Sequence, residues 1–141
     1  MPVYRTKVTW LGGNTGSLEC GNGTRMDFSA PPSLHGKHGV MTPEDGFVAS
    51  LNMCVHMMFI WVAERMKIEL LSYECEAEGT VQDRLDRTSV FTKLILRPRI
   101  VVRMATEEKV KQAMQLARKF SLVAESIRPE VVIEPEVTIK R

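Results

Sequence analysis

The chain has 141 residues, a length that suits one domain with a core of its own. Hydrophobic residues make up 44% of the sequence and charged residues 26%, as in an ordinary soluble globular protein. The formal net charge of +2 is too close to neutrality to indicate nucleic acid or an anionic membrane as a partner. We therefore expect a single domain over residues 1–141 that binds neither nucleic acid nor a membrane.

The cysteines indicate a reducing compartment. Cys20, Cys54 and Cys75 are few, odd in number and free of any CxxC spacing, which does not fit a disulfide-stabilised scaffold. The first ten residues, MPVYRTKVTW, lack the apolar core of a signal peptide. We expect a cytoplasmic protein.

The first forty residues predict three strands and a loop. Val3–Leu11 alternates polar residues with β-branched and aromatic ones, as a strand does. Ser17–Cys20 and Thr24–Phe28 are shorter candidate strands around the turn Gly21–Gly23. Ser29–Gly39 is rich in Pro, Gly and His and is predicted to be a loop.

A long helix follows. Thr42 is a favoured N-cap, and Glu44 and Asp45 suit the positive end of the helix dipole, so we predict a helix over Pro43–Met66. The apolar stretch Phe47–Ala63 is at the bottom of the membrane-spanning range, and polar residues interrupt it. We interpret it as the buried centre of a soluble fold. Because it is apolar on nearly every side, we hypothesise that a homodimer covers it.

The rest of the chain predicts strands on either side of a second helix. Tyr73–Ala77 alternates with glutamates and is a half-buried strand with an acidic outer face. Val90–Met104 is a longer strand, in which Pro98 predicts an edge or a bulge. A helix capped by Thr106 and a final strand, Val131–Lys140, complete one α+β domain.

The alternation in the longer strand and the spacing in the second helix assign side chains to faces. The inner side of the longer strand carries Leu94, Leu96, Ile100 and Val102. Its outer side carries Arg97, Arg99 and Arg103. The inner face of the second helix carries Val110, Ala113, Met114, Ala117 and Phe120.

Three segments resemble the OsmC/Ohr family, the osmotically induced protein C and organic hydroperoxide resistance proteins. They are TPEDGFVASLNMC (Thr42–Cys54), RTSVFTKLILRPRIVV (Arg87–Val102) and the helix region Glu107–Val131, together with the turn Gly12–Gly13. The resemblance implies an intertwined dimer with two central helices wrapped by sheet. It also implies reduction of organic hydroperoxides, in which a thiolate becomes a sulfenic acid, a second cysteine closes a disulfide and an external dithiol reopens it.

Carried over by position, Cys54 matches the family's peroxide-attacking cysteine, and Glu44 matches the glutamate that holds an arginine beside it. Two other positions depart from the family. Ser121 stands at the position of the second cysteine, and Asn14 stands at the position of the arginine. A serine hydroxyl cannot form a disulfide, and a buried thiol without a nearby cation has a raised pKa.

Two functions remain open. The first is a single-cysteine peroxidase that uses an external thiol, with an apolar pocket lined by Phe47, Leu51, Met57 and Met58, and with Arg25 or the outer arginines supplying a cation. The second is a non-catalytic protein that binds a small apolar or thioester-like ligand at the dimer interface. Cys54 could also be inert packing and Glu44 a helix-dipole residue.

Helix geometry restricts how Glu44 and Cys54 could act together, and the sequence offers no complete metal site. Ten residues of helix separate Glu44 from Cys54 by about 15 Å along the axis, so they can act together only through a partner chain or a bridging residue. His35 and His38 form an H-x-x-H pair, but no thiol or carboxylate lies close in sequence to complete a metal site. We expect neither a metal nor a cofactor.

Overall fold

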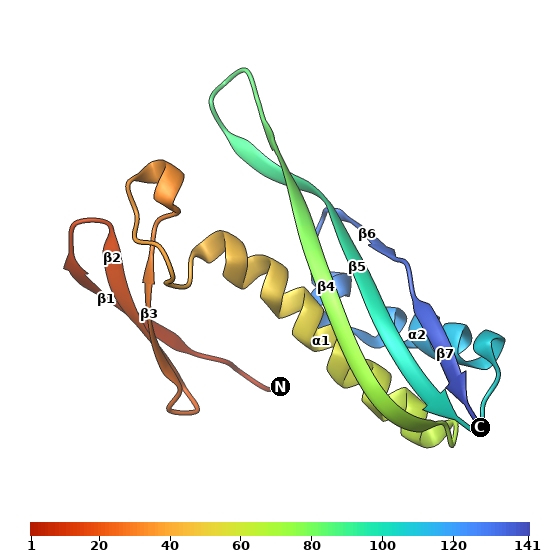
Figure 1. Ribbon diagram of the computed structural model, residues 1–141. Coiled ribbons are helices and arrows are strands. Elements are labelled where there is room, and N and C mark those ends of the chain that lie inside the picture. The colour runs from red at the N-terminus through yellow and green to blue at the C-terminus, as the bar shows by residue number, and fades with distance from the viewer. The chain divides into compact units, whose positions relative to one another are not determined.

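The computed structural model describes residues 1–141, which form two compact units, Met1–Phe47 and Val48–Arg141 (Figure 1). The first unit holds a three-stranded sheet, and the second a sheet of four strands with its helices. This α+β composition confirms the predicted fold class. A single domain over residues 1–141 stays a prediction.

The first unit is built on an antiparallel meander. Its strands are β1 (Thr6–Gly12), β2 (Thr15–Cys20) and β3 (Arg25–Ser29), in the order β1-β2-β3. A short 3₁₀ turn, Pro32–Leu34, interrupts the loop that follows. The three predicted strands are therefore confirmed, although the first begins three residues later than expected.

One face of this sheet is apolar and largely uncovered. Val8, Leu18 and Met26 lie opposite one another across the three strands. Because side chains alternate between the faces of a strand, Trp10 shares the face of Val8. Trp10 is 75% exposed and Val8 is 62% exposed. Such a surface is typical of a region that another element or chain covers.

The long helix α1 (Pro43–Arg65) begins at the predicted cap. The Thr42 hydroxyl accepts a hydrogen bond from the Asp45 N–H at 3.1 Å and donates one to the Asp45 carboxylate at 2.8 Å. This reciprocal pair satisfies an N–H group at the start of the helix that would otherwise lack a partner.

In the second unit, β4 (Glu69–Asp83) and β5 (Ser89–Arg103) form a long antiparallel hairpin, whose turn projects past the helices (Figure 1). β6 (Glu130–Ile133) and β7 (Glu136–Lys140) pair in parallel with β5. The predicted strand Val131–Lys140 is thus two strands, and Tyr73–Ala77 is only the middle of β4.

The expectation of an edge or a bulge at Pro98 was wrong, because β5 is central, with β4 on one side and β6 and β7 on the other. The Leu96 carbonyl accepts the Glu134 N–H at 2.9 Å, so even-numbered residues of β5 direct their backbone groups toward β6 and β7. Pro98 therefore faces the interruption between Ile133 and Glu136, where no ladder hydrogen bond is lost.

Two helices follow β5. The Thr106 hydroxyl accepts the Lys109 N–H at 3.1 Å and caps α2 (Glu107–Phe120) as predicted. The inner-face residues Val110, Ala113, Met114 and Ala117 are buried. Phe120 is not: it is 50% exposed and lies edge-on to Trp61, with the ring centroids 6.0 Å apart. A short helix, α3 (Leu122–Ser126), was not predicted.

The side of β5 that faces away from the helices carries an ion-pair ladder. Arg99 pairs with Glu74 at 3.0 Å and Arg103 with Glu69 at 3.2 Å, directly across the strands. Arg97 pairs with Glu78 at 2.7 Å. On the opposite side Leu94, Leu96, Ile100 and Val102 are buried, as expected from the alternation.

Only one side of α1 is buried within the chain. Leu51, Val55 and Phe59 are fully buried, whereas Met53 is 61% exposed and Met57 is 57% exposed. By length and composition alone α1 could span a membrane, but a core helix of a soluble protein passes the same test. The predicted burial on every side is not achieved by one chain.

Two glycine substitutions are expected to shift the free energy of unfolding in opposite directions. A Cβ at Gly36 would collide with the backbone carbonyl of Ala30, so Gly36→Ala should cost about 1–3 kcal/mol. A Cβ at Gly46 would meet only the Met41 sulfur at 3.9 Å, and alanine has the higher helix propensity, so Gly46→Ala should add up to about 1 kcal/mol. Urea denaturation of both variants measures the difference, and equal effects would contradict it.

Candidate functional site

Cys54 lies between the buried and the exposed sides of α1. It is half-buried, and its thiol is free. Helical spacing places Met57 and Met58 one turn further on the same side, and Met57 is exposed. The thiol therefore sits at the border of an apolar surface rather than inside a sealed core.

Glu44 lies in the first turn of α1, where it is exposed. Its carboxylate makes no hydrogen bond or ion pair within the chain. α1 is continuous through Gly46, whose N–H bonds to the Thr42 carbonyl at 2.9 Å. The helix is thus not broken in a way that would bring Glu44 back toward Cys54.

The arginines considered as replacement cations are engaged elsewhere. Arg25 pairs with Glu19 at 3.2 Å within the β2–β3 hairpin. Arg97, Arg99 and Arg103 occupy the outer side of the β4–β5 sheet, opposite the buried side chains of Leu94, Leu96, Ile100 and Val102. The outer arginines therefore do not reach Cys54 of their own chain.

Both departures from the family pattern have structural roles. Asn14 donates to the carbonyl of His35 at 3.4 Å, and its own carbonyl accepts the Ala30 N–H at 3.0 Å, so it ties the loop to the β1–β2 turn. Ser121 is fully buried, and its hydroxyl accepts the Ala124 N–H at 3.2 Å, which caps α3. Neither residue replaces the chemistry of an arginine or a second cysteine.

A polar cluster between α1 and β4 was not predicted. The Asn52 side chain donates to the Cys75 carbonyl at 3.1 Å, and the rings of His56 and Tyr73 lie 4.5 Å apart between centroids. The Tyr73 hydroxyl and His56 Nδ1 are buried without a hydrogen-bond partner of ordinary geometry. This cluster could have been predicted, because Asn52 and His56 are polar residues four positions apart in an apolar helix and therefore lie on the same side of it.

Burial sets the chemistry of this cluster. Burial raises the pKa of the Cys75 thiol. Burial also raises the pKa of the Tyr73 phenol, and the nearby Cys75 raises it further. Cys75 is therefore held as the neutral thiol, which is a poor nucleophile.

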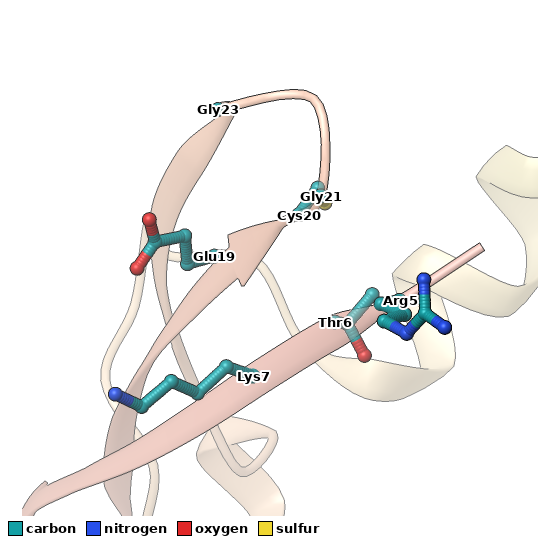
Figure 2. Close-up of a pocket in the computed structure, with 7 residues that line it drawn as sticks. All are labelled: Arg5, Thr6, Lys7, Glu19, Cys20, Gly21 and Gly23. Atoms are coloured by element: carbon teal, nitrogen blue, oxygen red, sulfur yellow. The ribbon is translucent and has the colours of Figure 1, made fainter.

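Cys20 ends β2 and lines a hollow of about 410 Å³ in the first unit (Figure 2). Figure 2 shows the side chains of Arg5, Lys7 and Glu19 extending in different directions, and none of them converges on the thiol. The hollow thus offers no organised group that would activate Cys20.

The H-x-x-H pair is confined to the loop, where both histidines are exposed. No cluster of three or more His, Cys, Asp or Glu side chains is arranged to hold a metal ion.

Comparison with known proteins identifies the family. The chain matches the family described as OsmC-like protein over residues 36–136, which is most of its length, and it belongs to that family. No match was found among curated proteins.

Solved structures share the fold at low sequence identity. An OsmC-like protein of unknown function from Vibrio cholerae is 23% identical with a TM-score of 0.88, covering 96% of this chain and 100% of that one. The organic hydroperoxide resistance protein OsmC of Legionella pneumophila is 21% identical, with a TM-score of 0.77 and 98% coverage of both chains. An organic hydroperoxide resistance protein of Elizabethkingia anophelis is 18% identical, with a TM-score of 0.77, covering 99% of this chain and 98% of that one.

The raised pKa of Cys75 predicts a loss of stability at alkaline pH. The unfolded thiol ionises near pH 8.5, whereas the folded thiol keeps its proton to higher pH. Its contribution to stability is therefore complete below about pH 8.5 and is lost as pH rises through the folded-state pKa. Urea denaturation between pH 7.5 and 9.5 should show a smaller loss for Cys75→Ser than for the parent protein. Cys20→Ser is the matched control, and a Cys75→Ser variant with the parental pH dependence would contradict the prediction.

Proposed function

We propose that this protein is an OsmC-type thiol peroxidase that reduces organic hydroperoxides through Cys54 alone. The observation that supports this most is the free, half-buried Cys54 thiol at the border of the exposed methionines Met53 and Met57. Membership of the OsmC-like family and its fold relatives named organic hydroperoxide resistance proteins support the same assignment.

The other thiols are less suited to the reaction. Cys75 is kept neutral by burial, and no cation converges on Cys20 in its hollow (Figure 2). Cys54 borders an apolar surface, and thioether side chains adapt to substrates of varied shape. A hydroperoxide with an apolar organic group is favoured over hydrogen peroxide there, because only the organic group gains from leaving water.

The reaction proceeds in two stages. The Cys54 thiolate attacks the terminal oxygen of the hydroperoxide, the O–O bond breaks, and the organic alkoxide leaves as the alcohol after taking a proton. Cys54 is then a sulfenic acid. An external thiol displaces water from it to form a mixed disulfide, and a second thiol releases Cys54 and the oxidised reductant. Since Ser121 has replaced the second cysteine, both thiols come from outside the chain.

A second copy of the chain would complete this site. Met53, Met57, Ile60 and Trp61 leave an apolar strip exposed along α1, and the first unit has its own uncovered apolar face. We propose a homodimer in which these surfaces are buried. Glu44, which has no partner within the chain, would there hold a cation near the partner's thiol. We also propose that the dimer works in the cytoplasm, where reducing thiols keep Cys54 free.

Leu51 does not line the substrate pocket. It is fully buried against the chain's own core, contrary to expectation, whereas Met57 is exposed and Met58 is half-buried. Met57 and Met58 therefore remain in the proposed apolar wall beside the thiol, and Phe47 as a lining residue stays a prediction.

The peroxidase proposal predicts a defined product at one residue. Reduced protein treated with cumene hydroperoxide should gain one oxygen, about 16 Da, on the peptide that contains Cys54. Consumption of the hydroperoxide with dithiothreitol should be lost in Cys54→Ser and kept in Cys20→Ser and Cys75→Ser. An unmodified Cys54 at millimolar hydroperoxide, with Cys54→Ser equal to the parent, would refute the proposal.

That negative result would favour the alternative function. Asn14 and Ser121 have no catalytic chemistry in their present roles, which is consistent with an OsmC-fold protein that binds a small apolar or thioester-like ligand at the dimer interface. A copurified ligand in the native mass spectrum, without consumption of hydroperoxide, would support this reading.

The dimer predicts a solution mass of about 32 kDa, twice the 16.0 kDa of the chain. Met57→Glu places a charge in the exposed strip of α1 and should shift the light-scattering mass toward the monomer. Leu122→Glu, on an equally exposed leucine in the first turn of α3, should leave the mass unchanged. A parent protein that is monomeric at micromolar concentration would exclude the dimer.

A further inference from the structure

A hollow of about 360 Å³ lies between α2 and the β6–β7 junction, in the second unit and apart from Cys54 in sequence. Its lining residues are Lys111, Met114, Gln115, Arg118, Ile133 and Pro135. The volume is within the range of small-molecule sites, at its lower end. No step of the proposed peroxidase reaction uses these residues.

The hollow forms where the sheet is interrupted between β6 and β7. β6 stops at Ile133 and β7 starts at Glu136, so the sheet is interrupted where Pro135 has no N–H to donate. Glu134 turns outward to pair with Arg97 at 3.5 Å. Because side chains alternate along the segment, Ile133 and Pro135 turn to the other side, toward α2.

The floor of the hollow is apolar and its rim is basic. Met114, 2% exposed, lies at the bottom of the hollow, and the half-buried Ile133 and Pro135 supply most of its apolar surface. Lys111 and Arg118 are two turns apart on α2, about 10 Å along its axis. Lys111 already pairs with Glu107 at 2.9 Å. Arg118 makes no ion pair or side-chain hydrogen bond, so its guanidinium is available to a ligand.

We infer that this hollow binds a small amphiphilic carboxylate, with its carboxylate on Arg118 and its apolar body along Met114, Ile133 and Pro135. A guanidinium presents paired N–H donors that match the two oxygens of a carboxylate. The negative end of the α2 dipole lies nearby and disfavours an anion, so Arg118 must supply the attraction. Lys111, at the other end of the hollow, adds a weaker electrostatic attraction for the carboxylate.

Octanoate is a suitable probe, because it combines one carboxylate with a flexible apolar body. Titration of the isotope-labelled full chain by NMR should show saturable shifts in residues 111–118 and 131–136. Octan-1-ol, which lacks the charge, should bind at least about tenfold more weakly, since hydrogen bonds to charged groups are the stronger ones. Shifts centred on the exposed side of α1, or equal binding of octan-1-ol, would overturn the inference.

Two pairs of variants locate the site. Arg118→Gln should weaken octanoate binding about tenfold or more, whereas Arg128→Gln, an exposed arginine outside the hollow, should not change it. Gln115→Phe should fill the hollow and abolish binding without changing the charge, whereas Gln112→Phe, exposed on the same helix but not in the lining, should bind as the parent does. Parental affinity in Arg118→Gln or Gln115→Phe would refute the site, as would the absence of saturable binding at millimolar octanoate.

Discussion

The packing of one side of α1 against β4 is the contact on which the rest of the second unit depends. Leu51, Val55 and Phe59 are fully buried, and Phe59 lies 5.6 Å from Tyr73 between ring centroids. Burying side chains of this size contributes roughly 1.5–3 kcal/mol each, so the buried side of α1 adds substantially to the core. The same contact determines which residues of α1 remain outside, and Cys54 lies at that border.

The placement of Cys54 follows from this division. The polar cluster of Asn52 and His56 lies against β4, where burial raises the pKa of the Cys75 thiol. At its actual position Cys54 avoids that cluster and adjoins exposed methionines instead. The two half-buried cysteines thus differ in their surroundings: Cys75 lies within β4 beside the polar cluster, and Cys54 lies on α1 at the border of the exposed surface.

The two residues that depart from the family pattern both have roles in the fold. Ser121 ends α2 and caps α3, a role that serine fills well. Asn14 donates to the carbonyls of Leu34 and His35 in the neighbouring loop. Both residues support the architecture, and neither supplies a thiol or a cation, so the proposed peroxidase chemistry depends on groups from outside the chain.

Features that depend on residues close together in the chain could be predicted from the sequence. The Thr42 and Thr106 caps, the alternation of Leu94 and Leu96 with the outer arginines, and the Cys54 motif each depend on residues close together in the chain. The tertiary structure decided what depends on distant partners. Pro98 is tolerated in a central strand because the opposing strand is interrupted. Phe120, at the end of α2, is half exposed and meets Trp61 of α1 edge-on instead of entering the core. The exposed side of α1 belongs to the same group, because periodicity shows that a helix is apolar but not how much of it one chain can cover.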